Sequence, residues 1–145
     1  MKIYADTNVL MAACVEEHPH HLQAFELLAK VKSSALQGFI SSHTLAEFYS
    51  VLTRAPFIPR VHPAEAGRLL EDNILPHFEL VTLSPEDYKS VLAGCAKAGL
   101  IGGVVYDALH LHCAQKAGCK RIYTFNVRDF RALAPTELQD KIAAP

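Results

Sequence analysis

Short apolar segments alternate with longer segments of helical periodicity along this chain. The apolar segments at residues 3–5, 38–41, 78–83 and 121–125 have the length and composition of strands. Helical patterns fill the intervals, at residues 9–15, 22–31, 42–52, 63–70, 85–95 and 104–117. Strands that alternate with helices predict an α/β fold, a three-layer sandwich with a mostly parallel central sheet flanked by helices.

Capping residues mark where several of these helices begin and end. Ser84-Pro85-Glu86-Asp87 combines a capping serine, a proline at the first helical position and acids in the first turn. Pro19 is placed to lie in the first turn of the helix that contains residues 22–31, and Gly118 follows the helix at 104–117 as its C-cap. Because no repeat or linker interrupts the pattern, residues 1–145 are expected to form a single domain.

Composition narrows the class of protein. Hydrophobic residues make up 50% of the chain and charged residues 20%, and the formal net charge is -1, which excludes a uniformly basic nucleic-acid binder. No apolar stretch is long enough to cross a bilayer, and Asp6, Glu16 and Glu17 come too early for a signal peptide. None of the four cysteines forms a C-x-x-C pair. We therefore expect a cytoplasmic protein with reduced thiols.

Four acids occupy positions where a predicted strand ends or a helix begins. Asp6 follows the first strand, Glu47 lies in an early turn of the helix after the second, and Asp107 and Asp129 begin later helices. Ligands of open parallel sheets bind at the carboxyl ends of the strands. Each acid alone has an ordinary alternative role: a helix cap for Asp6, a solvated helix face for Glu47, and a favourable contact with the helix N-terminus for Asp107 and Asp129.

Taken together, the four acids predict a site for a hard cation. Two carboxylates ~4 Å apart repel by about 4 kcal/mol at an effective dielectric of ~20, so a cluster needs a cation or raised pKa values. Oxygen donors alone favour Mg²⁺ or Mn²⁺ over zinc, and such an ion suits phosphodiester hydrolysis. Polar neighbours of the acids are expected to orient the ligands or bound waters, or to serve as ordinary turn and cap residues: Thr7, Asn8, Thr124 and Asn126.

Basic residues gather late in the chain despite the balanced net charge. The late group comprises Lys116, Lys120, Arg121, Arg128 and Arg131, and Arg54 and Arg60 flank a proline-bounded loop. Such patches are able to hold a phosphate backbone around an acidic centre, and a solvated surface is the alternative for each residue.

At these acids the chain resembles the PIN-domain family, and within it the VapC-type toxin ribonucleases of prokaryotic toxin–antitoxin modules. The resemblance covers nearly the whole chain and follows the family's order of motifs. The matching segments are Asp6-Thr7-Asn8, Ala46-Glu47, Asp107-Ala108-Leu109-His110 and Thr124-Phe125-Asn126-Val127-Arg128-Asp129-Phe130. Each segment is common by chance, whereas four in this order at compatible distances are specific.

The resemblance implies a Mg²⁺- or Mn²⁺-dependent endoribonuclease with an RNA substrate, homodimerisation, and a cognate antitoxin protein that blocks the site. Asp6, Glu47, Asp107 and Asp129 then serve as metal ligands and catalytic residues. One position departs from the strongest form of the pattern, because many relatives carry an acid where Asn126 stands. The fourth carboxylate must come from Asp129, which we expect to act through water or to bind weakly.

Four other interpretations remain open. A phosphatase of the haloacid dehalogenase type uses a first-strand Asp as nucleophile, but it needs a second Asp where Asn8 stands. A receiver domain needs a second acid next to Asp6. A catalytically silent PIN-like binding module would keep the fold and lose the activity. A zinc site at His110, His112 and Cys113 requires adjacent helical positions to point in one direction, which a helix disfavours.

Overall fold

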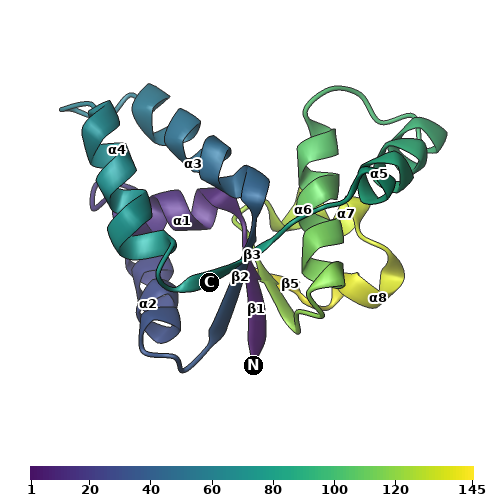
Figure 1. Cartoon of the computed structure of the whole chain (residues 1–145), viewed down its shortest axis with the longest axis horizontal. Coiled ribbons are helices and arrows are strands. Elements are labelled where there is room, and N and C mark those ends of the chain that lie inside the picture. Colours follow the sequence, from purple (N-terminus) through teal and green to yellow (C-terminus); the bar gives the residue numbers. More distant parts are fainter.

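Five parallel strands form one sheet in the computed structural model, which describes residues 1–145 (Figure 1). The strand order is β3-β2-β1-β4-β5, so β1 is central. The strands are β1 (Lys2–Ala5), β2 (Gln37–Ser41), β3 (Phe78–Val81), β4 (Arg121–Tyr123) and β5 (Ile142–Ala143). All four strand pairings are parallel, as the alternation of strands and helices predicts.

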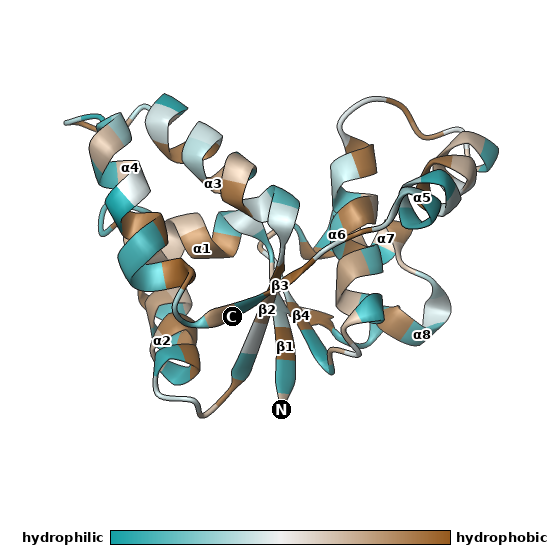
Figure 2. Ribbon diagram, viewed as in Figure 1, coloured by the Kyte–Doolittle hydropathy of each residue, from teal (hydrophilic) through white to brown (hydrophobic).

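Helices cover both faces of the sheet, which confirms the predicted α/β sandwich. On one side lie α1 (Thr7–Cys14), α2 (His21–Lys32), α3 (Ser42–Arg54) and α4 (Pro63–Leu69), which continues into the π-helical turn η1 (Leu70–Ile74) (Figure 1). On the other lie α5 (Pro85–Lys97), α6 (Val104–Lys116), α7 (Val127–Leu133) and α8 (Thr136–Gln139). Hydrophilic residues cover outer turns of helices such as α4 and α5 (Figure 2). None of the helices is long and apolar enough to cross a membrane.

The alternation of side chains along β1 assigns them to two separate cores. Ile3 and Ala5 are buried among residues of α1, α2 and α3, whereas Tyr4 is buried among residues of α6 and α7. Successive side chains of a strand point to opposite faces, so Asp6, the next residue after Ala5, lies on the Tyr4 side. The carboxylate of Asp6 therefore faces α6 at the carboxyl end of the central strand.

Several boundaries differ from the sequence prediction. Pro19 lies in the turn before α2, because the helix begins at His21. The caps at Ser84 and Gly118 are confirmed: Ser84 and Asp87 form a capping box, and Gly118 has a φ of +70°. The sequence pattern did not predict α8 or β5, which are only 4 and 2 residues long. Both follow the acids in sequence, and β5 completes the sheet next to β4.

Candidate functional site

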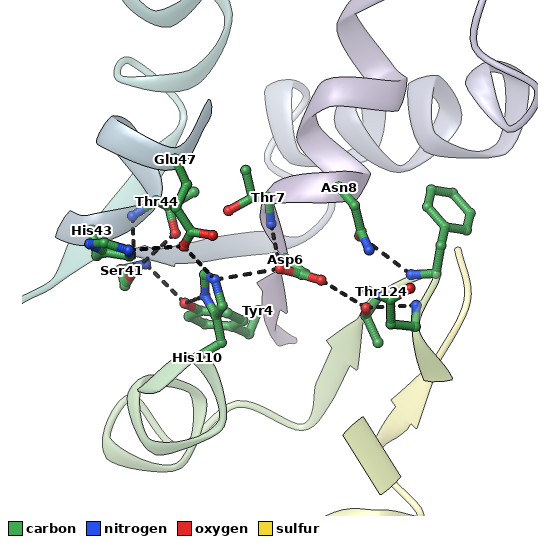
Figure 3. A network of polar contacts seen from close by, with 12 residues as sticks. Tyr4, Asp6, Thr7, Asn8, Ser41, His43, Thr44, Glu47, His110 and Thr124 are labelled. Carbon is green, nitrogen blue, oxygen red and sulfur yellow. Dashed lines mark hydrogen bonds and ion pairs between the residues drawn. The ribbon is translucent and has the colours of Figure 1, made fainter. Parts of the chain in front are cut away.

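Asp6 lies in the middle of a buried polar network at the carboxyl end of β1 (Figure 3). Its side chain is nearly buried, and it caps α1 by accepting from the Thr7 backbone N–H at Oδ1 over 2.7 Å. The Thr124 hydroxyl donates to Asp6 Oδ2 over 2.8 Å and fixes the second oxygen. Asp6 therefore has the ordinary capping role, and β1, α1 and the end of β4 together hold its carboxylate in one orientation.

His110 of α6 connects Asp6 to Glu47. The imidazole is 2% exposed, and its Nδ1 lies 2.7 Å from the Tyr4 hydroxyl. Its Nε2 lies 2.8 Å from Glu47 Oε1 and 3.5 Å from Asp6 Oδ1. A carboxylate only accepts, so Nε2 carries a proton and donates to Glu47. The imidazole thus ties α3 to the central strand, a role that the sequence analysis did not assign to His110.

The pKa values of this group follow from burial and mutual charge. Burial lowers the pKa of His110, but the hydrogen bond to Glu47 and the charges of Asp6 and Glu47 outweigh burial and raise it. Burial raises the pKa of Glu47, but the hydrogen bond and charge of His110 lower it below its usual value. Burial raises the pKa of Asp6 despite the opposing charge of His110. An imidazolium between two carboxylates is the arrangement that these shifts favour.

The charges of the other three predicted acids raise the pKa of Asp107. Its pKa is raised from 3.8 to about 6, first by burial and then by the negative charge of Asp6, with smaller contributions from Glu47 and Asp129. The structure places Asp6 and Glu47 on either side of His110 Nε2, at 3.5 and 2.8 Å, and Asp107 lies one turn before His110 in α6. Asp129 is exposed in the first turn of α7.

The donor chemistry of the edge fits a hard divalent cation. Its carboxylates supply oxygen donors, and the buried hydroxyl Thr7 Oγ1 has no hydrogen-bond partner although it lies near enough to Glu47 to lower the pKa of that acid. No three His, Cys, Asp or Glu side chains are arranged so that they could hold a metal ion as they stand. His110 Nε2 lies between the two acids, 3.5 Å from Asp6 Oδ1 and 2.8 Å from Glu47 Oε1, to which it donates a hydrogen bond.

The polar residues expected around the acids have distinct positions. Thr124 is buried and holds Asp6, and its hydroxyl also accepts from the Asn126 backbone N–H over 3.0 Å. Asn8 Oδ1 accepts from the Phe125 backbone N–H over 3.4 Å, which joins the start of α1 to the segment after β4. Of these side chains only Thr124 contacts an acid directly by a hydrogen bond.

The late basic residues do not surround the acids as a group. Lys120 and Arg121 lie at the amino end of β4, and the Lys120 N–H donates to the Lys2 carbonyl at the start of β1. Lys116 pairs with Asp87, and Arg131 donates to the Ile142 carbonyl of β5. Only Arg128, in the first turn of α7, lies next to the segment that carries Thr124.

The alternative zinc site is excluded by the directions of its three side chains. His110 faces Tyr4 and Glu47, whereas His112 contacts Asp87 over 3.0 Å. Cys113 is buried in the core on the α6 side of the sheet. All four cysteines are free thiols, two of them buried.

Comparison with known proteins identifies the family. A model described as "PIN domain" matches residues 3–134. The chain belongs to the PIN-domain family. Its curated relatives include Ribonuclease VapC27 of Mycobacterium tuberculosis, 38% identical over 104 residues, which are 72% of this chain and 70% of the relative. Ribonuclease VapC40 of the same species is 30% identical over 135 residues, 93% of this chain and 92% of the relative. The expected VapC-type PIN membership is thus confirmed.

Solved structures of the PIN family share the fold. Mycobacterium tuberculosis VapC20, a toxin that cleaves the Sarcin-Ricin loop, superposes with a TM-score of 0.72 at 18% identity, over 93% of this chain and 97% of VapC20. VapBC2 of Rickettsia felis, solved with a DNA fragment from its promoter, gives a TM-score of 0.62 at 22% identity, over 91% of this chain and 92% of its own. At these identities the likeness establishes the three-layer architecture of this PIN-family chain.

Proposed function

We propose that this PIN-family protein is a metal-dependent endoribonuclease that hydrolyses RNA phosphodiester bonds, and that it is the toxin of a type II toxin–antitoxin module. The observation that carries the proposal is the pair of acids Asp6 and Glu47 on either side of His110 at the carboxyl end of β1, with Asp107 one turn before His110 in α6. The relatives that match most of the chain are ribonucleases of the VapC type, which supports the same activity.

The proposed mechanism assigns each acid a part. Asp6, Glu47 and Asp107 would hold Mg²⁺ or Mn²⁺, and Asp129 would assist from the exposed side. When bound, such an ion lowers the pKa of an attacking water and stabilises the leaving oxygen. Thr124 and the Thr7 N–H keep the Asp6 carboxylate in a fixed orientation. His110 holds Glu47 over the centre and partly neutralises the acids while they face one another.

The proposed partners are an antitoxin protein, a second copy of this chain and RNA. VapBC2, whose structure resembles this one, is a pair of VapB and VapC, which supports a partner of the antitoxin class. Co-expression with the gene adjacent to that of this protein tests the pairing. We expect a complex that purifies intact and no longer cleaves RNA. Light scattering of the isolated protein tests the proposed homodimer.

The phosphatase alternative is disfavoured at Asn8. Its amide oxygen accepts a backbone hydrogen bond from Phe125, and an amide has no acidic proton to donate to a leaving group. Turnover of p-nitrophenyl phosphate without cleavage of RNA would support the phosphatase instead of the nuclease.

The Asp6→Asn variant tests the proposal. It keeps the shape of the side chain and removes its charge, so we expect loss of Mg²⁺-dependent RNA cleavage with retention of the fold. The matched control is Asp72→Asn, which changes an exposed acid of η1 and leaves cleavage unchanged. Circular dichroism and cleavage of a labelled RNA are measured on all three proteins. Cleavage by Asp6→Asn at the wild-type rate would contradict the mechanism.

A further inference from the structure

Two stacks of side-chain rings flank the acidic edge. In the first, the His43 imidazole of α3 lies parallel to the Tyr106 ring of α6, with an interplanar angle of 4° and centroids 5.2 Å apart. In the second, the Phe125 ring stacks on His20 at 4.6 Å and lies 6.2 Å from His18. We call these pairs the Tyr106 stack and the Phe125 stack. Figure 3 shows His43 and Asn8, which contacts the Phe125 backbone, on opposite sides of Asp6.

Each stack is attached directly to the acids. Tyr106 precedes Asp107 in α6, and His43 Nε2 lies 3.4 Å from Glu47 Oε1. Phe125 follows Thr124, the residue whose hydroxyl donates to Asp6. A molecule that contacts both stacks would therefore pass over the carboxylates between them.

Both stacks are open to solvent. Tyr106 is 47% exposed, His20 is exposed, and Phe125 is half-buried. Single exposed rings are ordinary on a protein surface. Here, however, stacked rings occur on both sides of one acidic centre. Tyr106 is exposed beside His43, and the exposed His20 covers Phe125, which packs against the core on the α1 side of the sheet.

Few of the late basic residues lie at this edge to attract an RNA backbone. Without a bound cation the carboxylates repel a phosphate backbone, and Lys120 and Arg121 lie at the amino end of β4, away from them. Arg128 is the one late basic residue beside the site. Contacts to the bases are a further source of affinity, and stacking of a base on an aromatic side chain supplies it without sequence preference.

We propose that the Tyr106 stack and the Phe125 stack each bind one nucleobase of single-stranded RNA, one on either side of the phosphodiester that lies over the acids. This inference rests on the proposed ribonuclease function and specifies its substrate. Bases reach such rings only when they are unpaired and unstacked from their neighbours, so a loop or a single strand is accepted and a continuous duplex is not.

A double-mutant cycle between a ring and a base tests the inference. The RNAs are single strands of roughly ten nucleotides, each with one abasic position, and binding is measured in the Asp6→Asn background. In the protein that keeps both stacks, we expect loss of the base at two of these positions to weaken binding about tenfold each. Tyr106→Ala should abolish the penalty at one position, and Phe125→Ala should abolish it at the other.

Conservative and remote variants serve as controls. Tyr106→Phe and Phe125→Tyr keep a ring and should retain both penalties, which excludes a purely structural effect. Phe25→Ala removes an exposed ring that packs on His21 of α2, away from the acids, and should also retain them. If the loss of affinity caused by an abasic position persists in Tyr106→Ala and in Phe125→Ala, the proposed binding of bases by the two stacks is wrong.

The failure of this inference is distinguishable from failure of the proposed function. RNA cleavage by the wild-type protein is measured separately and decides whether the chain is a nuclease. If the wild type cleaves RNA but the abasic positions weaken binding equally in the ring variants, only the proposed base binding by the stacks is wrong. Failure of the wild type to cleave RNA overturns the nuclease proposal, and the binding cycle still reports on the stacks.

Discussion

The two sides of the acidic edge are built differently. Hydrogen bonds connect His110 of α6 to Tyr4 of β1 and to Glu47 of α3, and an ion pair at 3.5 Å connects His110 to Asp6. Asp129 is exposed in the first turn of α7, and none of the ion pairs of the molecule includes it. The first side is fixed before any ligand arrives, whereas the second is free to adjust. We therefore expect the four acids to contribute unequally to RNA cleavage.

Asp107→Asn should produce the largest effect. Burial, together with the negative charges of the other acids, raises the pKa of Asp107 to about 6. Removal of this charge should lower Mg²⁺-dependent RNA cleavage by roughly 100-fold or more, the loss typical of a central electrostatic group. Single-turnover cleavage measures the change, with Asp140→Asn, an exposed acid near β5, as the control. A loss no greater than that of Asp129→Asn would erase the difference between the two sides.

Tyr4→Phe should destabilise the fixed side. The Tyr4 hydroxyl contacts His110 Nδ1 and accepts from the Ser41 backbone N–H over 3.1 Å, and all three residues are buried. Loss of the hydroxyl leaves two buried polar groups unpaired, at a cost of about 2 kcal/mol. Urea unfolding measures this cost. Tyr49→Phe changes an exposed tyrosine of α3 and should leave the free energy of unfolding unchanged.

Asp107 should also make stability depend on pH. In the metal-free protein its pKa is about 6 when folded, against an ordinary 3.8, so the folded state holds this proton more tightly than the unfolded state. The ionised group therefore lowers stability as the pH rises from about 4 through 6. Asp107→Asn should raise Tm at pH 7 by ~3 °C and have little effect at pH 4. An equal shift of Tm at both values would show that repulsion is not the cause.

Asp129→Asn should have the smallest effect of these substitutions. An exposed carboxylate acts through solvent, so we expect RNA cleavage to fall only about threefold and the Mg²⁺ concentration at half-maximal rate to rise by a similar factor. Titration of cleavage with Mg²⁺ measures both. A loss as large as that of Asp107→Asn would place Asp129 among the central acids.

The acids were predictable because their signal is local. Asp6-Thr7-Asn8 follows a strand, and Asp107 begins an apolar helix, so topology alone places both at one edge. The contact of His110 with Tyr4 was not predictable, since 106 residues separate the two in sequence. Its only sequence signal is a polar residue on the buried side of an apolar helix. Ile142–Ala143 was missed because two residues are too few to show a period.

The grouping of basic residues in the sequence did not predict their positions around the acids. Lys120, Arg121 and Arg128 are close in sequence. However, Lys120 and Arg121 lie at the amino end of β4, whereas Arg128 lies beyond its carboxyl end. Proximity along a chain becomes proximity in space only within one element or turn. The acids are far apart in sequence, but parallel strands all end at the same edge of the sheet, so residues at those ends become neighbours in space.

The hydrogen bonds of Asp6 limit how it is able to bind a ligand. A carboxylate has about four lone-pair positions. The Thr7 N–H takes one on Oδ1, the Thr124 hydroxyl takes one on Oδ2, and His110 Nε2 faces Oδ1 at 3.5 Å. One unshared position on Oδ2 is left for an incoming group, so Asp6 is restricted to a single-oxygen contact of fixed direction. Chelation through both oxygens would require Oδ1 to give up either the cap of α1 or its contact with His110.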